Sequence, residues 1–181
     1  VWSLDAEQLA KDVYISDAVI RKGEYYAGVF TSPSNHRVLK LQKREDFKSL
    51  TAVSTPKWLT DWHTLSALPL KELLREDEWL SQVRMVSMKW VDFVMMPLMP
   101  SLKNQYHLED IRLVAVPNIV LQLNDSRHFI ISKHHPDASQ AYAALQAGLK
   151  QLRKQGAIEK AYKEAGFIPN LNDYTVINST D

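Results

Sequence analysis

The chain has 181 residues, 45% of them hydrophobic, and its 22 lysine and arginine residues nearly balance its 21 aspartate and glutamate residues. This length suits one domain or two small lobes with a buried core, while the charge balance and the scatter of the basic residues argue against phosphate-driven binding to nucleic acid. There is no cysteine, which excludes disulfides, thiolate metal sites and cysteine nucleophiles.

The first part of the chain reads as short helices and strands. Residues 5–10 have helix-forming composition behind Asp5, a residue type that caps helices well. The runs at 13–16 and 25–30 are rich in β-branched and aromatic residues and predict strands, and a loop at 31–35 follows them. Further elements are expected as a short helix at 45–50, a strand at 50–54, a helix at 57–65 and a helix at 71–76.

The rest of the chain adds apolar runs of strand length and two helices. The runs lie at 82–86, 91–96, 111–116 and 128–133. Strands that are apolar throughout and alternate with helices predict an α/β architecture with buried parallel pairing. From Ala138 apolar residues recur at helical spacing, so we expect a long helix that Asp137 caps and Gly156 ends. A short helix over 157–165 then stops at Gly166.

A polar turn, "STPKW" at 54–58, joins a predicted strand to a predicted helix. The unpaired N–H groups of a first helical turn bind anions and polar ligand groups. The hydroxyls of Ser54 and Thr55 would serve equally well as helix caps, and the two roles are compatible. Trp58 and Trp62, at i and i+4, share one helix face and either stack on a ligand or belong to the core.

Two further clusters allow more than one interpretation. A group of soft apolar residues suits either core packing or a ligand surface; it comprises Met85, Met88, Met95, Met96 and Met99, with Trp90 and Phe93. His134, His135 and Asp137 share one turn, but neighbouring side chains on a turn rarely converge on one ion. We therefore expect an exposed turn there and no metal site.

The sequence gives no positive support for catalysis. It contains no nucleophile-elbow motif, no glycine-rich phosphate loop and no zinc-protease motif. Asp61 and His63, at i and i+2, do not face each other on a helix. We expect no catalytic residue and no cofactor.

The segment from His128 to Phe167 carries a resemblance to a known family. "HFIISKHHPDASQAYAALQAGLKQLRKQGAIEKAYKEAGF" reads as a strand, a basic turn, a long helix, a glycine stop and a short Tyr-containing helix. This order resembles the closing segment of the bacterial extracellular solute-binding proteins of family three, which have the type II periplasmic binding fold. The stretches "AEQLAKDVYIS", "EDFKSLTAV" and "VDFVMM" resemble earlier segments of that family in the same order.

The resemblance implies an α/β fold of two lobes joined by hinge strands, with a ligand in the cleft between them. Lobe one would comprise residues 1–31 and 127–181, and lobe two residues 32–126. The family's N-terminal strand–helix–strand–helix segment has no counterpart in this sequence. We therefore expect an incomplete lobe one, whose open strand edge would favour self-association.

Two positions depart from the pattern of the family's amino-acid binders. Those proteins place an arginine ahead of a Phe-Ser strand to bind the ligand carboxylate, and Leu9 stands at that position here. They also place an acid on lobe two for the ligand's amino group, where this sequence has Pro97. Neutral residues do not replace a bidentate arginine–carboxylate pair, so we do not expect a standard amino acid as the ligand.

The resemblance thus implies a non-enzymatic periplasmic solute-binding protein that serves an ABC transporter or a signalling partner. The alternatives are an extracytoplasmic sensor domain of a membrane signalling protein and a dehydratase-like enzyme, which would need an acid or base in the cleft. Hydroxyls would orient the ligand, backbone N–H groups would bind an anionic part, and aromatic rings would supply apolar area. The candidate ligand-binding residues are Trp2, Ser3, Ser54, Thr55, Trp58 and Met96.

Overall fold

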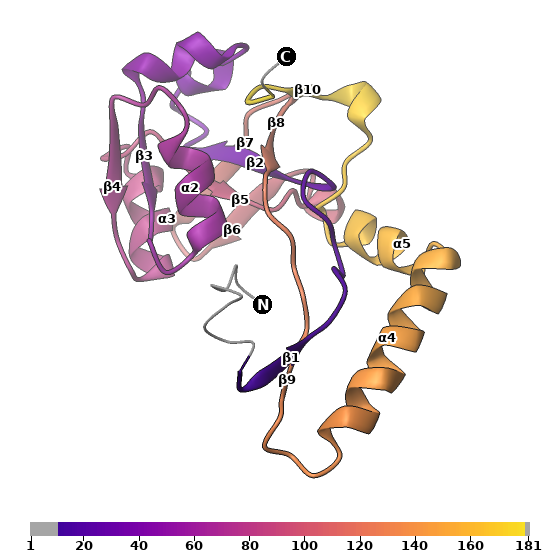
Figure 1. Cartoon of the computed structure of the whole chain (residues 1–181). Coiled ribbons are helices and arrows are strands. Elements are labelled where there is room, and N and C mark those ends of the chain that lie inside the picture. Colours follow the sequence, from indigo (N-terminus) through magenta and orange to yellow (C-terminus); the bar gives the residue numbers. More distant parts are fainter. Residues whose placement is uncertain (1–10, 180–181) are drawn as a thin grey trace.

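A computed structural model describes residues 11–179 as a mixed α/β molecule with one large sheet and a smaller ribbon-and-helix part (Figure 1). The expected helix at 5–10 and the candidate residues Trp2, Ser3 and Leu9 lie outside the described residues. The large sheet has eight strands in the order β10-β8-β2-β5-β3-β4, with β7 on β2 and β6 on β7. No helix within residues 11–179 is both long and apolar enough to cross a bilayer.

Strand β2 (Tyr25–Thr31) is the centre of the large sheet and is buried along its whole length. It pairs antiparallel with β5 (Phe93–Met96) on one side and with β7 (Ile111–Ala115) and β8 (Ile119–Leu123) on the other. Its aromatic and β-branched residues fit a pleated surface that is covered on both faces. The strand predicted at 25–30 is thus confirmed, although its pairing is antiparallel.

Parallel pairs occur at the two ends of the strand order, away from the central strand β2. Strand β3 (Thr51–Ser54) pairs parallel with β4 (Glu72–Arg75) and with β5. At the opposite edge the short β10 (Thr175–Val176) pairs parallel with β8. The carboxyl ends of β3, β4 and β5 therefore meet at one edge of the sheet, where connecting segments lead into helices.

Two sequence predictions are wrong in this region. The segment at 71–76, predicted as a helix, forms β4, because backbone pairing with β3 from Thr51↔Glu72 to Ser54↔Arg75 overrides its local propensity. The run at 82–86, predicted as a strand, lies within helix α3 (Trp79–Ser87). Its buried residues Gln82, Val83 and Val86 follow a helical spacing, which a window of five apolar residues does not reveal.

Helices α2 (Leu59–Ser66) and α3 cover opposite faces of the sheet. Because side chains alternate along a strand, β2 contributes Tyr25 and Val29 to the core that contains Leu65 of α2. It contributes Tyr26 and Phe30 to the core beneath α3. The remaining elements here are β6 (Gln105–Leu108) and the short 3-10 helices Val38–Lys40, Arg44–Ser49, Pro100–Leu102 and Leu171–Asp173.

The C-terminal helices form as predicted. The first lies away from the large sheet (Figure 1), while Tyr162 of the second packs against the core of that sheet. Helix α4 (Ala138–Lys154) ends before Gly156, and α5 (Ala157–Glu164) follows. Asp137 precedes α4 but makes no side-chain cap bond. The two-stranded ribbon of β1 (Val13–Ile15) and β9 (Ile130–Ser132) packs on α4, where the Tyr14 and Tyr142 rings stack with centroids 4.9 Å apart.

Two crossing segments join the ribbon to the large sheet, as the expected hinge strands would. One runs from β1 to β2 and the other from β8 to β9, and they pair antiparallel. The Ser16 N–H donates to the Phe129 carbonyl at 2.9 Å, and the Arg127 N–H donates to the Ile20 carbonyl at 2.9 Å. Both segments lead from the ribbon to the large sheet. That sheet includes β2 and β10, whose residues fall within the ranges predicted for lobe one. The lobe boundaries at residues 31 and 126 stay a prediction.

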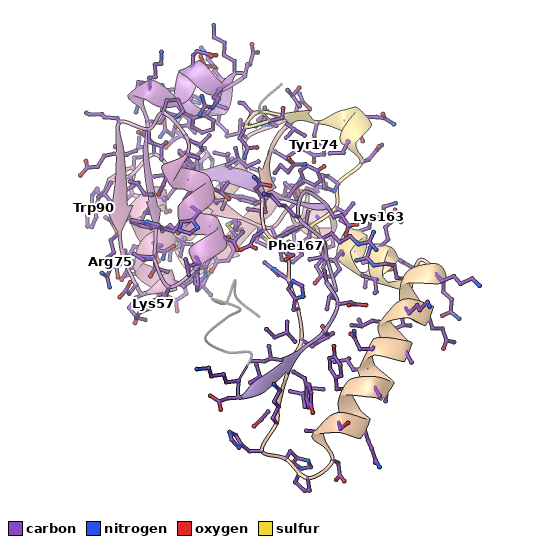
Figure 2. The ribbon with its side chains drawn as sticks, in the orientation of Figure 1. Lys57, Arg75, Trp90, Lys163, Phe167 and Tyr174 are labelled. Atoms are coloured by element: carbon purple, nitrogen blue, oxygen red, sulfur yellow. The ribbon has the colours of Figure 1, made fainter. Side chains whose placement is uncertain are left out.

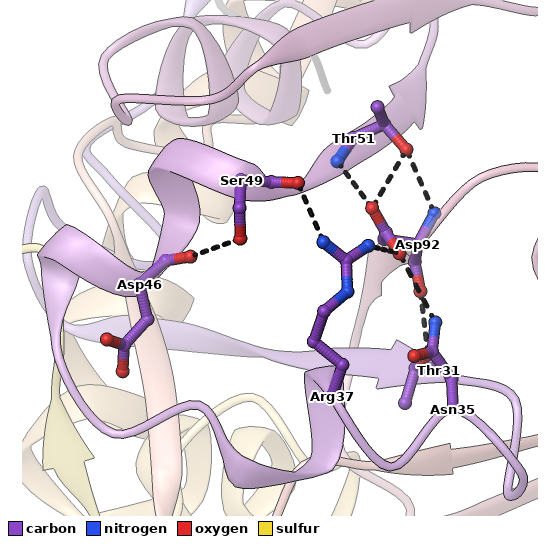
Figure 3. A network of polar contacts seen from close by, with 7 residues as sticks. All are labelled: Thr31, Asn35, Arg37, Asp46, Ser49, Thr51 and Asp92. Atoms are coloured by element: carbon purple, nitrogen blue, oxygen red, sulfur yellow. Dashed lines mark hydrogen bonds and ion pairs between the residues drawn. The ribbon is translucent and has the colours of Figure 1, made fainter.

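The amino end of β5 is held by a polar network around Asp92 (Figure 3). The Asp92 carboxylate accepts hydrogen bonds from the Arg37 guanidinium at 2.6 Å, the Thr51 N–H at 2.9 Å and the Asn35 amide at 3.3 Å. The Thr31 hydroxyl donates to the Asp92 carbonyl at 2.6 Å. Burial alone would raise the pKa of Asp92, but these bonds outweigh burial and lower that pKa.

We expect Asp92→Asn to reduce the free energy of unfolding by about 2 kcal/mol near neutral pH, because charge-assisted hydrogen bonds are lost. A lowered pKa stabilises the fold above the ordinary aspartate pKa, and this contribution is lost as pH falls through the folded-state pKa. The difference between the two proteins should therefore shrink below about pH 4. Urea titrations at several pH values measure it. Asp110→Asn, at an exposed turn, is the control, and an equal loss in both variants would contradict the role of the network.

Candidate ligand-binding cavity

A cavity of about 470 Å³ opens at the carboxyl edge of the parallel strands, where α2 and α3 begin. It is lined by Trp58, Thr60, Asp61, Trp79, Met95, Met96, Pro97 and Arg127. Ligands of open α/β sheets bind at this edge, because loops and helix N-termini converge there. Its volume and predominantly apolar lining are those of a small-molecule site.

Aromatic rings form one wall of the cavity. Trp58 directly precedes α2 and Trp79 opens α3, and their ring centroids lie 5.9 Å apart at 49°. Trp79 in turn meets Tyr106 of β6 edge-to-face at 6.0 Å. Trp79 therefore contacts both Trp58 and Tyr106, and the three rings form one rigid aromatic surface. Met95 and Met96, which end β5, add an adaptable apolar surface nearby.

Asp77 ties together the two segments that carry these tryptophans. Its carboxylate accepts a hydrogen bond from the Thr55 hydroxyl at 2.6 Å and pairs with Lys57 and Arg75, each at 3.1 Å. Figure 2 shows Lys57 and Arg75 close together beside the sheet. The hydrogen bond from Arg75, with those from Thr55 and Lys57, places the pKa of Asp77 well below its usual range. The connection from β3 to α2 is thereby fixed to the connection from β4 to α3.

The structure separates the candidate residues predicted from the sequence. Trp58 and Met96 line the cavity, whereas Ser54 and Thr55 are buried outside its lining. Neither hydroxyl caps α2, because the helix begins only at Leu59. Thr55 instead accepts a hydrogen bond from the Lys57 N–H at 3.2 Å while it donates to Asp77.

Two charged residues that sequence reasoning did not select line the cavity. Asp61 lies in the first turn of α2, and its burial raises its pKa to about 6, against the opposing effect of the Arg127 cation. From the sequence, Asp61 is considered only as a partner of His63, whereas the structure places it in the cavity wall. One signal was available, because the predicted helix puts Asp61 three residues after Trp58, on the same face. Arg127 follows β8 and belongs to no recognisable motif.

Arg127 is positioned by aromatic rings rather than by an ion pair. Its guanidinium lies over the Tyr25 ring at 5.0 Å and over the Phe167 ring at 4.9 Å. It forms no salt bridge with any residue that the structure describes. Burial raises the pKa of the Tyr25 hydroxyl, against the effect of the Arg127 cation. The cavity thus contains a cation that forms no salt bridge within residues 11–179 and that can attract a ligand's anionic group.

A second, more polar cavity of about 290 Å³ lies on the other side of α2. Thr60 lines both cavities, and its hydroxyl donates to the Asp125 carboxylate at 2.9 Å. The second cavity is also lined by Arg44, His63, Gln122, Asn124 and Asn178. Its polar groups are partly used within the protein, since the Arg44 guanidinium donates to the Ala67 carbonyl at 2.7 Å.

No protein-family model and no curated protein sequence matches this chain. Solved structures do match in fold. The GLUR0 ligand-binding core in complex with L-glutamate is similar with a TM-score of 0.59 and 11% identity, over 91% of this chain and 69% of that one. An arginine transport-system periplasmic binding protein from Legionella pneumophila matches with a TM-score of 0.58 and 13% identity, over 91% and 69%.

An ancestral amino acid-binding protein, a precursor of cyclohexadienyl dehydratase, matches with a TM-score of 0.54 and 17% identity, over 91% of this chain and 65% of that one. A protein from Bacillus subtilis matches over the whole of this chain and 66% of its own, with a TM-score of 0.53 and 13% identity. The chain therefore spans about two thirds of the length of these structures. Its fold is that of the type II periplasmic binding proteins, as the sequence resemblance implies.

Proposed function

We propose that this chain binds a small organic ligand in the cavity between Trp58, Trp79 and Arg127, as a periplasmic solute-binding protein. The observation that carries the proposal is the apolar cavity at the carboxyl edge of β3, β4 and β5, with a cation and an acid in its wall. Similar folds that bind L-glutamate or serve arginine transport support the same reading. We also propose that the chain acts with a membrane transporter or a signalling protein. Self-association through the open edge of lobe one is a separate proposal that concerns two copies of this chain.

The proposed ligand is larger and more apolar than a free standard amino acid. A cavity of about 470 Å³ lies in the size range of sites for drug-sized molecules. Two tryptophans and two methionines face it, and Pro97 lines it where the resemblance would place an acid. An aromatic or branched organic molecule with one ionised group fits this lining best.

A second candidate function is acid–base catalysis, which Asp61 favours. A carboxyl group with a pKa of about 6 exchanges protons readily near neutral pH. The similarity to a precursor of cyclohexadienyl dehydratase points in the same direction. Binding remains the primary proposal, because the described cavity contains no second acid or base besides Asp61 and the permanently charged Arg127.

The cavity proposal is tested with anilinonaphthalene sulfonate, a fluorescent organic anion with an aromatic body. We expect Trp58→Ala to weaken dye binding about tenfold, because stacking and buried area are both lost. Trp90→Ala is the matched control, since Trp90 is 69% exposed and does not line the cavity. Fluorescence titration measures both variants, and equal effects would refute the cavity as the binding site.

Calorimetry with the standard amino acids tests the proposed ligand size. We expect no dissociation constant in the micromolar range or below, because a free amino acid leaves much of the apolar lining in contact with water. Micromolar binding of any one of them would contradict the proposed ligand size, and would mean that an amino acid is held without an arginine at position 9 or an acid at position 97. Trp58→Ala in the same titrations would then locate that binding.

A further inference from the structure

Backbone hydrogen bonds on both sides fix the main chain of Arg127. Its N–H donates to the Ile20 carbonyl at 2.9 Å, and its own carbonyl accepts from the Val19 N–H at 2.8 Å. The position of the side chain is therefore set by what surrounds the guanidinium. Within residues 11–179 no carboxylate forms a salt bridge with it, although Asp61 shares the cavity.

Two aromatic rings lie against the guanidinium. It lies 5.0 Å from the centre of the Tyr25 ring and 4.9 Å from that of Phe167, and the two rings are themselves 6.4 Å apart at 59°. Arginine stacks on aromatic rings through its planar face and keeps its N–H donors at the edge. Arg127 also lines the cavity, so its N–H donors can reach a ligand that is bound there.

Phe167 comes from the C-terminal segment that follows α5, and Figure 2 shows it beside the large sheet. The Tyr26 N–H donates to the Phe167 carbonyl at 2.7 Å, and the Leu98 N–H donates to the Gly166 carbonyl at 3.2 Å. Leu98 follows Pro97 of the cavity wall. Phe167 also meets the Tyr162 ring of α5 at 5.8 Å, so its own ring is held on a second side.

We propose that Phe167 is a positioning residue for the Arg127 guanidinium, and that the cation so placed binds the carboxylate or sulfonate of an amphipathic organic anion. The inference rests on the proposed function and adds the charge class of the ligand. A half-buried cation beside apolar walls favours a ligand that brings one anionic group and one apolar body. The segment around Gly166 and Phe167 thereby contributes to recognition without lining the cavity.

The test compares anilinonaphthalene sulfonate with N-phenylnaphthylamine, its uncharged counterpart without the sulfonate. We expect Arg127→Gln and Phe167→Leu each to weaken the anionic dye about tenfold and the neutral dye less than about twofold. Phe167→Tyr, which keeps the ring, should retain the preference for the anion. Circular dichroism and thermal melts confirm that each variant is folded before it is titrated.

Two results would overturn the inference, and a third would overturn the cavity proposal instead. Equal weakening of both dyes by Phe167→Leu would show a purely structural role for the ring. An unchanged dye preference in Arg127→Gln would show that the cation does not contact the sulfonate. If Trp58→Ala affects neither dye while Arg127→Gln still removes the preference for the anion, the cavity proposal fails and Arg127 acts elsewhere.

Discussion

Gly166→Ala is expected to lower the free energy of unfolding by about 3–5 kcal/mol, because it combines backbone strain with a steric clash. Gly166 has φ of +80°, and a Cβ atom there would overlap the carbonyl of Leu98. The overlapping atom belongs to the backbone and cannot rotate away. Relief requires the Gly166–Phe167 segment to leave the sheet, which would break its bonds to Leu98 and Tyr26.

Two other glycines distinguish the effect of backbone strain from that of the steric clash in the same experiment. Gly148 lies inside α4 with open space around it, so Gly148→Ala should stabilise the protein by about 0.5–1 kcal/mol. Gly156 has φ of +73° but also open space, so Gly156→Ala should show the strain alone, about 1 kcal/mol. Urea titration measures all three. A loss at Gly166 no larger than at Gly156 would show that the C-terminal segment is not docked against Leu98.

Asp61→Asn is expected to stabilise the protein at neutral and alkaline pH. Burial raises the pKa of Asp61 to about 6, above the ordinary aspartate value, so the ionised form is disfavoured in the folded state. An acid with a raised pKa contributes stability while it is protonated, and that contribution is lost as pH rises toward about 6. Above this pH the buried carboxylate costs up to about 3 kcal/mol, which the asparagine variant avoids.

The readout is the difference in unfolding free energy between Asp61→Asn and the wild type at about pH 8 and about pH 4. The variant should be the more stable protein at the higher pH and should lose this advantage at the lower one. Asp92→Asn provides a control of opposite sign, because the pKa of Asp92 is lowered by its hydrogen bonds. A variant that is no more stable than the wild type at alkaline pH would mean that Asp61 is well solvated or paired.

The sequence predicts those elements whose pattern is long or whose composition is distinctive. Helix α4 has 17 residues with periodic apolar positions, and β2 is rich in aromatic and β-branched residues. Strand β4 and helix α3 were misassigned because a few residues support either structure, and pairing with β3 or burial against the sheet decides between them. Such tertiary effects are not visible in a short window.

A site residue was predictable where its position follows from the sequence pattern of its own helix or strand. Trp58 and Met96 stand at the ends of recognisable elements, and the structure places both in the cavity lining. Arg127 was not predictable, because its role depends on Tyr25 and Phe167, which lie about a hundred and forty residues apart along the chain. Thr55 has the residue type of a ligand contact, yet a carboxylate from another loop uses its hydroxyl.

The most direct test of the central claim is a crystal structure of the full chain soaked with anilinonaphthalene sulfonate. The account predicts that the aromatic body lies against Trp58 and Trp79 and that the sulfonate accepts hydrogen bonds from Arg127. Density for the dye in the polar cavity beside Arg44 and His63, or only on the outer surface, would contradict it.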